Sequence, residues 1–149
     1  SDAFHMTSPS PNGEGAADCM RLAIADARLN MEDVDYINAH GTGTLANDET
    51  ETNAIKQVFG DHASKLAASS TKAMHGHALG ASSALELIAT TLAIYHGIIP
   101  PTVNFTTADE ACDLDYVPNE AREQDINYAL TNSFAFGGLN AVIALKKHN

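Results

Sequence analysis

Apolar residues recur along the first part of the chain at two different spacings, which predict a helix followed by a strand. From residue 14 to about residue 29 they return every three or four positions, as on one face of a helix. The members of this face are Met20, Ala23, Ile24 and Ala27. Over residues 34–40 the apolar positions nearly alternate, which is typical of a strand. The first elements are therefore a helix and a strand that ends near His40.

The rest of the chain continues this alternation. A helix is expected to begin at Asn47 or Asp48, either of which could cap it, and to end at Gly60 after about Phe59. The remaining expected elements are a strand over residues 66–69, a helix over about 79–95, and strands over 128–133 and 141–147. Strands that alternate with helices form βαβ units. The pattern predicts one α/β domain over residues 1–149, with a mixed, mostly parallel sheet and packed helices.

Composition and charge restrict the class of protein and its partners. Of the 149 residues 44% are hydrophobic and 18% are charged, which is enough apolar content for a packed core. The 8 basic and 19 acidic residues give a net charge of −11, which argues against nucleic acid and anionic membranes as partners. Two cysteines, Cys19 and Cys112, form no disulfide framework. A reducing, cytoplasmic location is expected.

The ends of the chain and its most apolar stretch add two expectations. Residues 78–101 are interrupted by Glu86 and His96, so a core helix is expected there instead of a membrane span. The first residues show neither a basic region nor an apolar region of a targeting segment. Because the sequence opens without Met in a loop-like stretch, we expect it to be a fragment.

Three polar segments each follow an apolar strand: residues 38–44, 69–77 and 132–138. Ligands of open α/β sheets gather at the carboxyl ends of the strands, so we expect these segments to converge on one site. Together they offer two imidazoles, one ammonium group, several hydroxyls and backbone N–H groups beside glycines. Such groups hold an anion or an oxyanion. No evident nucleophile lies among them.

Each histidine of these segments also has a plainer interpretation. A lone histidine at a strand end is often structural, but the Gly-Thr-Gly-Thr loop after His40 favours a functional one. His77 precedes a helix, whose dipole would keep a neutral imidazole available as a hydrogen-bond donor. A metal site built from His40, His75 and His77 is set aside, because the spacing of these histidines matches no metal motif.

Lys72 is surrounded by small and hydroxyl residues, so it is either a solvated cation or a buried one that needs a carboxylate partner. Asp48 and Glu51 share a helix face and are the candidates, although a solvated acidic face would explain them equally well. Phe134 and Phe136 alternate along a strand and are most simply core residues, with one of them available to line a pocket. Spacing alone therefore predicts an oxyanion-stabilising site of unknown substrate.

Five segments of this sequence resemble the β-ketoacyl-acyl-carrier-protein synthases, the thiolase-like condensing enzymes. The main ones are residues 38–44 (NAHGTGT), 69–81 (SSTKAMHGHALGA) and 132–138 (NSFAFGG). Residues 2–9 and 112–118 support them in the same order, so the resemblance covers essentially the whole chain. It is nearest to the type II synthases of fatty-acid elongation. The implied fold is the C-terminal half of a thiolase-like αβαβα sandwich.

The resemblance implies a decarboxylative Claisen condensation, in which a malonyl-derived enolate attacks an acyl group held on a cysteine. His40 and His77 match the two histidines that stabilise the enolate. Lys72 matches a lysine that pairs with a helix carboxylate, which corresponds to Glu51. Asp48 matches a second acidic position beside it. These residues are the implied catalytic set, with Asp48 and Glu51 in support.

The resemblance also implies how the substrate is held. Thr42 and Thr44 match hydroxyls that bind the pantetheine arm, and Phe136 matches an aromatic that gates the cysteine, with Phe134 beside it in the substrate-binding region. No separate cofactor and no metal are implied, because the substrate arrives on the phosphopantetheine of acyl carrier protein. Ala135 departs from the usual glycine at its position. The added methyl group is expected to stiffen the loop or narrow the acyl entrance.

A second departure is that the family's nucleophilic cysteine belongs to an N-terminal half that this sequence lacks. Cys19 and Cys112 match no nucleophile position, so this chain alone is expected to be inactive. The implied partners are acyl carrier protein, the missing half and, at full length, a second copy in a homodimer. A half with one sheet face uncovered is also expected to self-associate.

Two other functions remain open. One is a non-catalytic subunit similar to a chain-length factor; loss of the catalytic positions would favour it, and none of them is lost in this sequence. The other is a synthase of a polyketide or polyene pathway, which shares the chemistry and differs only in substrate.

Overall fold

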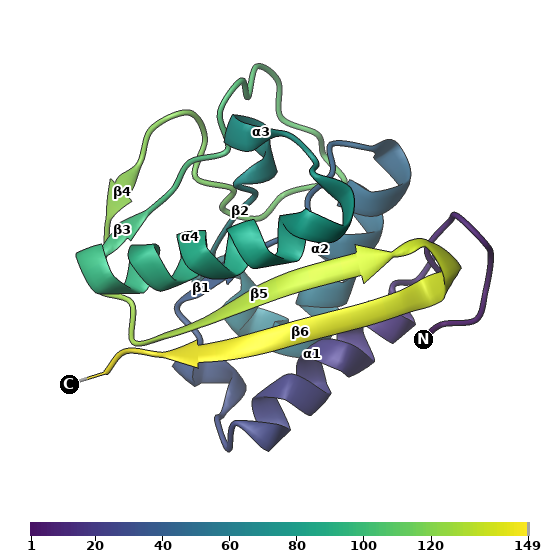
Figure 1. The fold of residues 1–149 in the computed structure, drawn as a ribbon, viewed down its shortest axis with the longest axis horizontal. Coiled ribbons are helices and arrows are strands. Elements are labelled where there is room, and N and C mark those ends of the chain that lie inside the picture. The colour runs from purple at the N-terminus through teal and green to yellow at the C-terminus, as the bar shows by residue number, and fades with distance from the viewer. Residues whose placement is uncertain (149) are drawn as a thin grey trace.

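A four-stranded sheet forms the centre of the computed structural model, which describes residues 1–148. Its strand order is β2-β1-β5-β6 (Figure 1). The central strand β1 (Tyr36–Asn38) pairs in parallel with β2 (Ala67–Ser69) and with β5 (Tyr128–Ala135). The strand β6 (Leu139–Lys146) returns antiparallel to β5. The predicted mixed, mostly parallel sheet is confirmed.

Helices cover both faces of the sheet. The helices α1 (Glu14–Asp26) and α2 (Leu45–Phe59) pack on one face, and α4 (Ser82–His96) lies across the other (Figure 1). A single helical turn, α3 (Lys72–His75), connects β2 to α4. Beyond α4, β3 (Ile98–Ile99) and β4 (Arg122–Glu123) form a small antiparallel pair. Short 3-10 turns occur at Met31–Asp33, Gly60–Ser64, Leu79–Ala81 and Phe136–Gly138.

The two-residue period of the strands divides the core into two clusters. Ile37 and Leu130 point to the side of α1 and α2, where they pack with Met20 and Ile55. The neighbouring strand positions point to α4, and their cluster consists of Tyr36, Ala67, Ala93, Ile94, Ile99, Val117, Ile126 and Ala129. The parallel strands β1 and β2 are therefore buried on both faces, as parallel strands usually are.

The helix α4 has the opposite polarity from an ordinary surface helix. Its buried side toward the sheet carries Ser82, Glu86 and Thr90 in addition to Ala93 and Ile94. Its exposed side carries an apolar stripe, which consists of Leu85, Ile88, Leu92 and Tyr95. On the neighbouring strand β6, Leu139 and Ile143 are exposed as well. A helix that is apolar on its outer side is typical of a position between two layers.

Several predicted boundaries differ from the structure. The first helix ends at Asp26, so Ala27 is exposed and outside it. The strand predicted over residues 34–40 is only Tyr36–Asn38, because Val34 closes the turn before it and His40 turns toward α2. The long helix begins at Ser82, after a 3-10 turn over the segment predicted to open it.

The capping residue of α2 was predicted wrongly. Thr44 is the cap, and its hydroxyl accepts a hydrogen bond from the backbone N–H of Asn47 at 3.3 Å. Asp48 lies in the first turn, where a carboxylate also suits the helix dipole. The predicted end at Gly60 is confirmed, with a positive φ of 52° that favours glycine.

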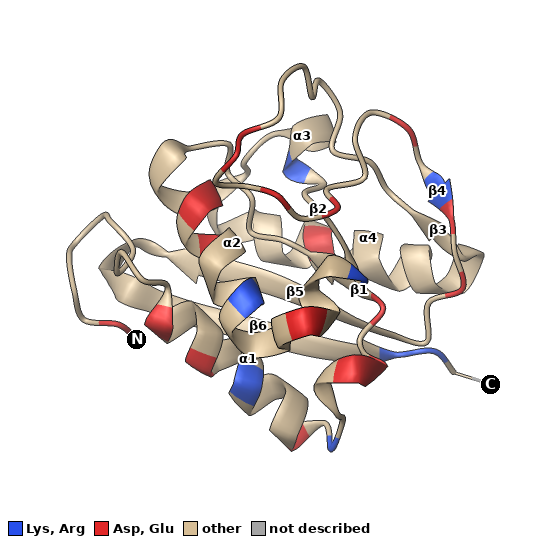
Figure 2. Ribbon diagram, turned by 180° about the vertical axis from the view of Figure 1, so that it is seen from behind, with Lys and Arg blue, Asp and Glu red and all other residues tan. Residues whose placement is uncertain are grey.

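The charged side chains are distributed as the composition suggests, with many acidic residues and few basic ones. Figure 2 shows acidic positions on α1, α2 and the segment leading to β4, and no cluster of lysine and arginine on that side. Among residues 1–148, no helix has the length and hydropathy needed to cross a membrane.

Candidate active site

Three segments that are far apart in sequence meet at the carboxyl ends of the parallel strands. The ring of His40, after β1, lies 5.6 Å from the ring of His77, with an interplanar angle of 85°. The ring of Phe134, on β5, lies 5.7 Å from His40 at 60°. The prediction that the three polar segments converge is therefore confirmed.

His40 is buried, with an exposed fraction of 9%, and its Nδ1 has no hydrogen-bond partner among the described residues. Burial, the Lys72 ammonium and the neighbouring His77 lower the pKa of His40 to about 3. The imidazole is therefore neutral around pH 7. A neutral imidazole can donate one hydrogen bond without carrying a buried charge.

His77 is exposed on the open side of the site, and its orientation is fixed by its own neighbours. Its Nδ1 accepts a hydrogen bond from the backbone N–H of Leu79 at 3.1 Å and lies 3.0 Å from Ser82 Oγ. Because Nδ1 accepts, a neutral ring carries its proton on Nε2. The N–H group of His77 is then directed away from the helix.

Lys72 is buried and pairs with Glu86, and its Nζ also donates to the backbone carbonyl of His40 at 2.5 Å. Only 4% of the Lys72 side chain and 1% of the Glu86 side chain are exposed. Burial raises the pKa of the Glu86 carboxyl above its usual value, and the Lys72 ammonium opposes that shift. The lysine therefore has the carboxylate partner that its burial requires.

The predicted partners of Lys72 were wrong, because neither Glu51 nor Asp48 pairs with it. Glu51 is already occupied and anchors the loop after β1 to α2 and β5. Its carboxylate accepts hydrogen bonds from the backbone N–H groups of His40 (2.9 Å) and Gly41 (2.8 Å) and from the side-chain amides of Asn47 (3.2 Å) and Asn132 (3.1 Å). Asp48 accepts from the backbone N–H of Gly43 at 3.2 Å. Both carboxylates therefore hold the loop that carries His40.

Sequence reasoning missed Glu86, which it treated only as an interruption of an apolar stretch. The signal was present in the sequence. Ser82, Glu86 and Thr90 follow one another at four-residue intervals, which places them on one face of a helix. A polar stripe in an otherwise apolar helix indicates a buried polar contact, and here that contact is Lys72.

Some of the predicted site residues line a cavity of about 650 Å³ at the site, but Thr44, Phe134 and Phe136 do not. Thr42 lines it, and its hydroxyl lies 3.0 Å from that of Thr44. Lys72 and His77 also contribute to its wall. Phe136 is 72% exposed on the turn after β5, so the expectation that it is a core residue was wrong. The reason is that the strand ends at Ala135, and the turn directs the next side chain outward.

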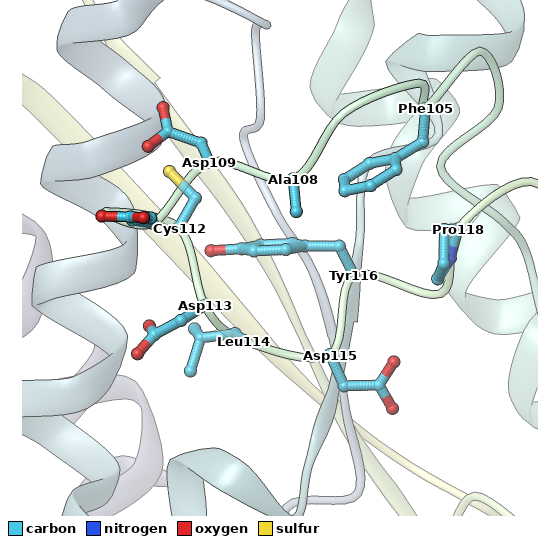
Figure 3. Close-up of a pocket in the computed structure, with 10 residues that line it drawn as sticks. Phe105, Ala108, Asp109, Cys112, Asp113, Leu114, Asp115, Tyr116 and Pro118 are labelled. Atoms are coloured by element: carbon cyan, nitrogen blue, oxygen red, sulfur yellow. The ribbon is translucent and has the colours of Figure 1, made fainter.

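A second cavity, of about 480 Å³, adjoins this one and is lined by residues between Phe105 and Pro118 (Figure 3). This segment contains four acidic residues within 109–115 and is called the acidic loop. Tyr116 extends across it toward Cys112, and its hydroxyl bonds to Thr52 of α2. Asp113 and Asp115 pair with Lys56 and Arg122, so they are not free ligands. Within residues 1–148 no three His, Cys, Asp or Glu side chains are grouped to hold a metal ion.

Neither cysteine has the environment of an activated thiol. Burial raises the pKa of Cys19, on α1, and of Cys112, in the acidic loop. Reactive cysteines usually have a lowered pKa. Cys112 lines the 650 Å³ cavity together with Lys72 and His77, and Cys19 is not among the residues that line it.

Comparison with known proteins gives one family and a consistent group of relatives. Residues 1–106 match the model of the β-ketoacyl synthase C-terminal domain. Nodulation protein E of Rhizobium meliloti is 56% identical over 146 residues, covering 98% of this chain and 36% of the relative. The 3-oxoacyl-[acyl-carrier-protein] synthase 2 of Coxiella burnetii is 55% identical over 146 residues, covering 98% and 35%. The chain therefore spans about a third of the length of these relatives.

Solved structures agree in fold. A ketosynthase of a type II polyketide system, in complex with its acyl carrier protein and bound to the hexaketide, superposes with a TM-score of 0.97 at 40% identity, covering 99% of this chain and 36% of that one. The ishigamide ketosynthase/chain length factor gives 0.94 at 49% identity, covering 99% and 36%. The thiolase-like fold expected from the sequence is confirmed.

The buried pair Lys72 and Glu86 predicts a large and specific effect on stability. Replacing Lys72 by Met leaves the Glu86 carboxylate buried without a counter-charge, which is expected to destabilise the protein by about 3–5 kcal/mol in urea unfolding. The double variant Lys72→Met, Glu86→Leu should recover most of this loss. The control is Lys56→Met, which removes an exposed pair with Asp113 and should cost about 1 kcal/mol or less. Equal losses in the two lysine variants would contradict the assignment.

The environment of His40 predicts a titration far from that of an ordinary histidine. Its folded pKa of about 3 lies below the unfolded value of about 6.5, so the unfolded state binds the proton more readily. The contribution to stability is therefore lost as the pH falls from about 6.5 toward 3. NMR of the histidine rings should show His40 neutral down to pH 5. A midpoint near 6.5 would be incompatible with this burial.

Proposed function

The chain belongs to the β-ketoacyl synthase family, and from this premise we propose that it is the C-terminal part of a 3-oxoacyl-[acyl-carrier-protein] synthase of fatty-acid elongation. The full-length enzyme would condense an acyl thioester with malonyl-acyl carrier protein, with loss of CO2. The observation that carries this proposal is the pair of imidazoles, His40 and His77. Their rings lie 5.6 Å apart at the carboxyl ends of the parallel strands.

In this proposal the two histidines stabilise the enolate. As the malonyl carboxylate leaves as CO2, negative charge develops on the thioester carbonyl oxygen. His77 donates from Nε2, since its Nδ1 is occupied by the Leu79 N–H, and the neutral ring of His40 donates a second hydrogen bond. Donors that are oriented before the reaction and excluded from water are usually the largest electrostatic term in catalysis.

The buried pair of Lys72 and Glu86 holds the backbone of His40 in place. The Lys72 ammonium holds the His40 carbonyl at 2.5 Å and, with burial, favours the neutral form of the His40 ring. Glu51 and Asp48 fix the backbone of the same loop through its N–H groups. The acidic residues therefore act through the position of His40 and not as proton donors.

The substrate arm would enter through the 650 Å³ cavity. Thr42 at its wall and Thr44, whose hydroxyl lies 3.0 Å from that of Thr42, would offer hydroxyls to the amides of a pantetheine arm. Phe134, beside His40, and the exposed Phe136 would contact the substrate near the histidines. The acyl group is carried on the phosphopantetheine of acyl carrier protein, so no further cofactor is needed. A similar ketosynthase solved in complex with its acyl carrier protein supports this partner.

The nucleophile would come from an N-terminal half of the same protein, because neither Cys19 nor Cys112 is activated. We assign the apolar outer face of α4, with Leu85, Ile88 and Leu92, as the surface on which that half packs. The chain spans about a third of its relatives, which leaves ample sequence for such a half. Alone the chain would be inactive, and the full-length protein would be a homodimer.

Two other assignments have support among the relatives. The similarity to a ketosynthase/chain length factor structure favours a non-catalytic subunit as the second candidate. The presence of His40, His77 and the Lys72 pair favours an active synthase over that candidate. A polyketide or polyene pathway would use the same groups on a different acyl chain.

Replacing either imidazole tests the enolate role directly. In the full-length protein, His40→Ala and His77→Ala should each slow malonyl-acyl carrier protein decarboxylation on the order of 10²–10³-fold, because each removes one donor to the developing oxyanion. The control is His148→Ala, an exposed histidine far along the chain. Variants of the pair that remain as active as the control would favour the non-catalytic candidate.

A charge on the outer face of α4 tests the packing of the N-terminal half. Ile88 is 57% exposed in this chain, so Ile88→Glu is tolerated if that face meets water. If the other half covers it, the buried carboxylate should destabilise the full-length protein on the order of 3 kcal/mol in urea unfolding. Leu22→Glu is the matched control, because Leu22 is 70% exposed on α1. Equal stability of the two variants would refute the assigned interface.

A further inference from the structure

Asn38 is the last residue of β1, and its side chain is fully buried between the sheet and α4. Its amide nitrogen lies 3.1 Å from Thr90 Oγ1, 3.3 Å from the Glu86 carbonyl oxygen and 3.3 Å from Thr71 Oγ1. Its amide oxygen accepts from the backbone N–H and the hydroxyl of Thr71, both at 3.4 Å. One side chain therefore bonds to two other segments of the chain.

Two of these contacts belong to the proposed active site or lie directly beside it. Thr71 directly precedes Lys72, and Glu86 is the partner of that lysine. Asn38 itself stands two positions before His40, whose carbonyl accepts from Lys72. The amide thus joins the three backbone segments that carry His40, Lys72 and Glu86.

We propose that Asn38 is a positioning residue for the condensation, because its amide fixes the end of β1, the start of α3 and the first half of α4 in one arrangement. In that arrangement the Lys72 and Glu86 pair stays against the His40 carbonyl, and the His40 ring stays against His77. This proposal rests on the proposed function, since it concerns the geometry of the same site.

Only a short amide side chain can make all the hydrogen bonds required at position 38. The side chain must donate to the Glu86 carbonyl and to Thr90 while it accepts from the Thr71 N–H. Aspartate has the same shape but donates nothing when ionised, and it would place a second carboxylate beside Glu86. An apolar residue of similar size would leave buried polar groups of both neighbours without partners.

Tyr36 provides a matched control on the same strand and the same face. It is equally buried, and its hydroxyl bonds to Ser69 Oγ at 2.9 Å. Its side chain makes no hydrogen bond to His40, Lys72 or Glu86 among the described contacts. Tyr36→Phe therefore removes a buried hydrogen bond between strands without loosening the site.

The experiment compares Asn38→Ala, Asn38→Asp and Tyr36→Phe in the full-length protein, with decarboxylation of malonyl-acyl carrier protein as the assay. Both Asn38 variants should lower kcat by about 10- to 100-fold with KM unchanged, because a small misplacement of catalytic groups affects the reaction more than binding. Tyr36→Phe should lose some thermal stability and keep its kcat.

NMR titration of His40 supplies a readout that a loss of stability alone does not move. In Asn38→Ala the Lys72 ammonium is less firmly held and water can reach the ring, so the pKa of His40 should rise from about 3 toward its ordinary value. In Tyr36→Phe it should stay where it is. If Asn38→Ala does not fold, Thr90→Val removes one acceptor of the amide, and it should also lower kcat with KM unchanged.

The outcomes separate this proposal from the proposed function. If His40→Ala loses decarboxylation while the Asn38 variants, or Thr90→Val in their place, keep the wild-type kcat, the positioning role is overturned and the synthase assignment stands. If His40→Ala itself keeps the wild-type rate, the synthase assignment fails and the positioning role fails with it. A fall in kcat for the Asn38 variants with normal activity in Tyr36→Phe supports both.

Discussion

The buried ion pair between Lys72 and Glu86 is the constraint on which the site depends. Neither charge could remain in a nearly water-free position without the other. The lysine also holds the carbonyl of His40, so the pair determines where that ring lies and favours its neutral form. Charged residues of this chain therefore determine the electrostatic environment of His40.

The same constraint explains the polarity of α4. Because Glu86 must face Lys72, the helix turns its polar stripe toward the sheet and its apolar stripe outward. The apolar stripe of α4 therefore faces away from the sheet, where a second layer of the protein can pack on it. One pair of charges organises both the chemistry and the surface on which we propose that the rest of the protein packs.

Much of this arrangement could be predicted from the sequence. Periodicity predicted the alternation of strands and helices, and the motif around His40 predicted the meeting of three loops. The partner of Lys72 was predicted wrongly, because Asp48 and Glu51 also meet the need for a carboxylate and the polar stripe of Ser82, Glu86 and Thr90 was overlooked. Only packing shows that four donors already occupy Glu51, and that α4 presents Glu86 instead. The exposure of Phe136 was missed because strand alternation does not reveal where the strand ends.

The central claim is that the imidazoles of His40 and His77 share one developing oxyanion. A crystal structure of the full-length protein with a malonyl-thioester analogue that cannot decarboxylate tests it most directly. The account predicts that the carbonyl oxygen of the analogue lies within hydrogen-bond distance, about 2.7–3.1 Å, of one nitrogen of His40 and of Nε2 of His77. A carbonyl bound elsewhere, with the two histidines unengaged, would contradict it.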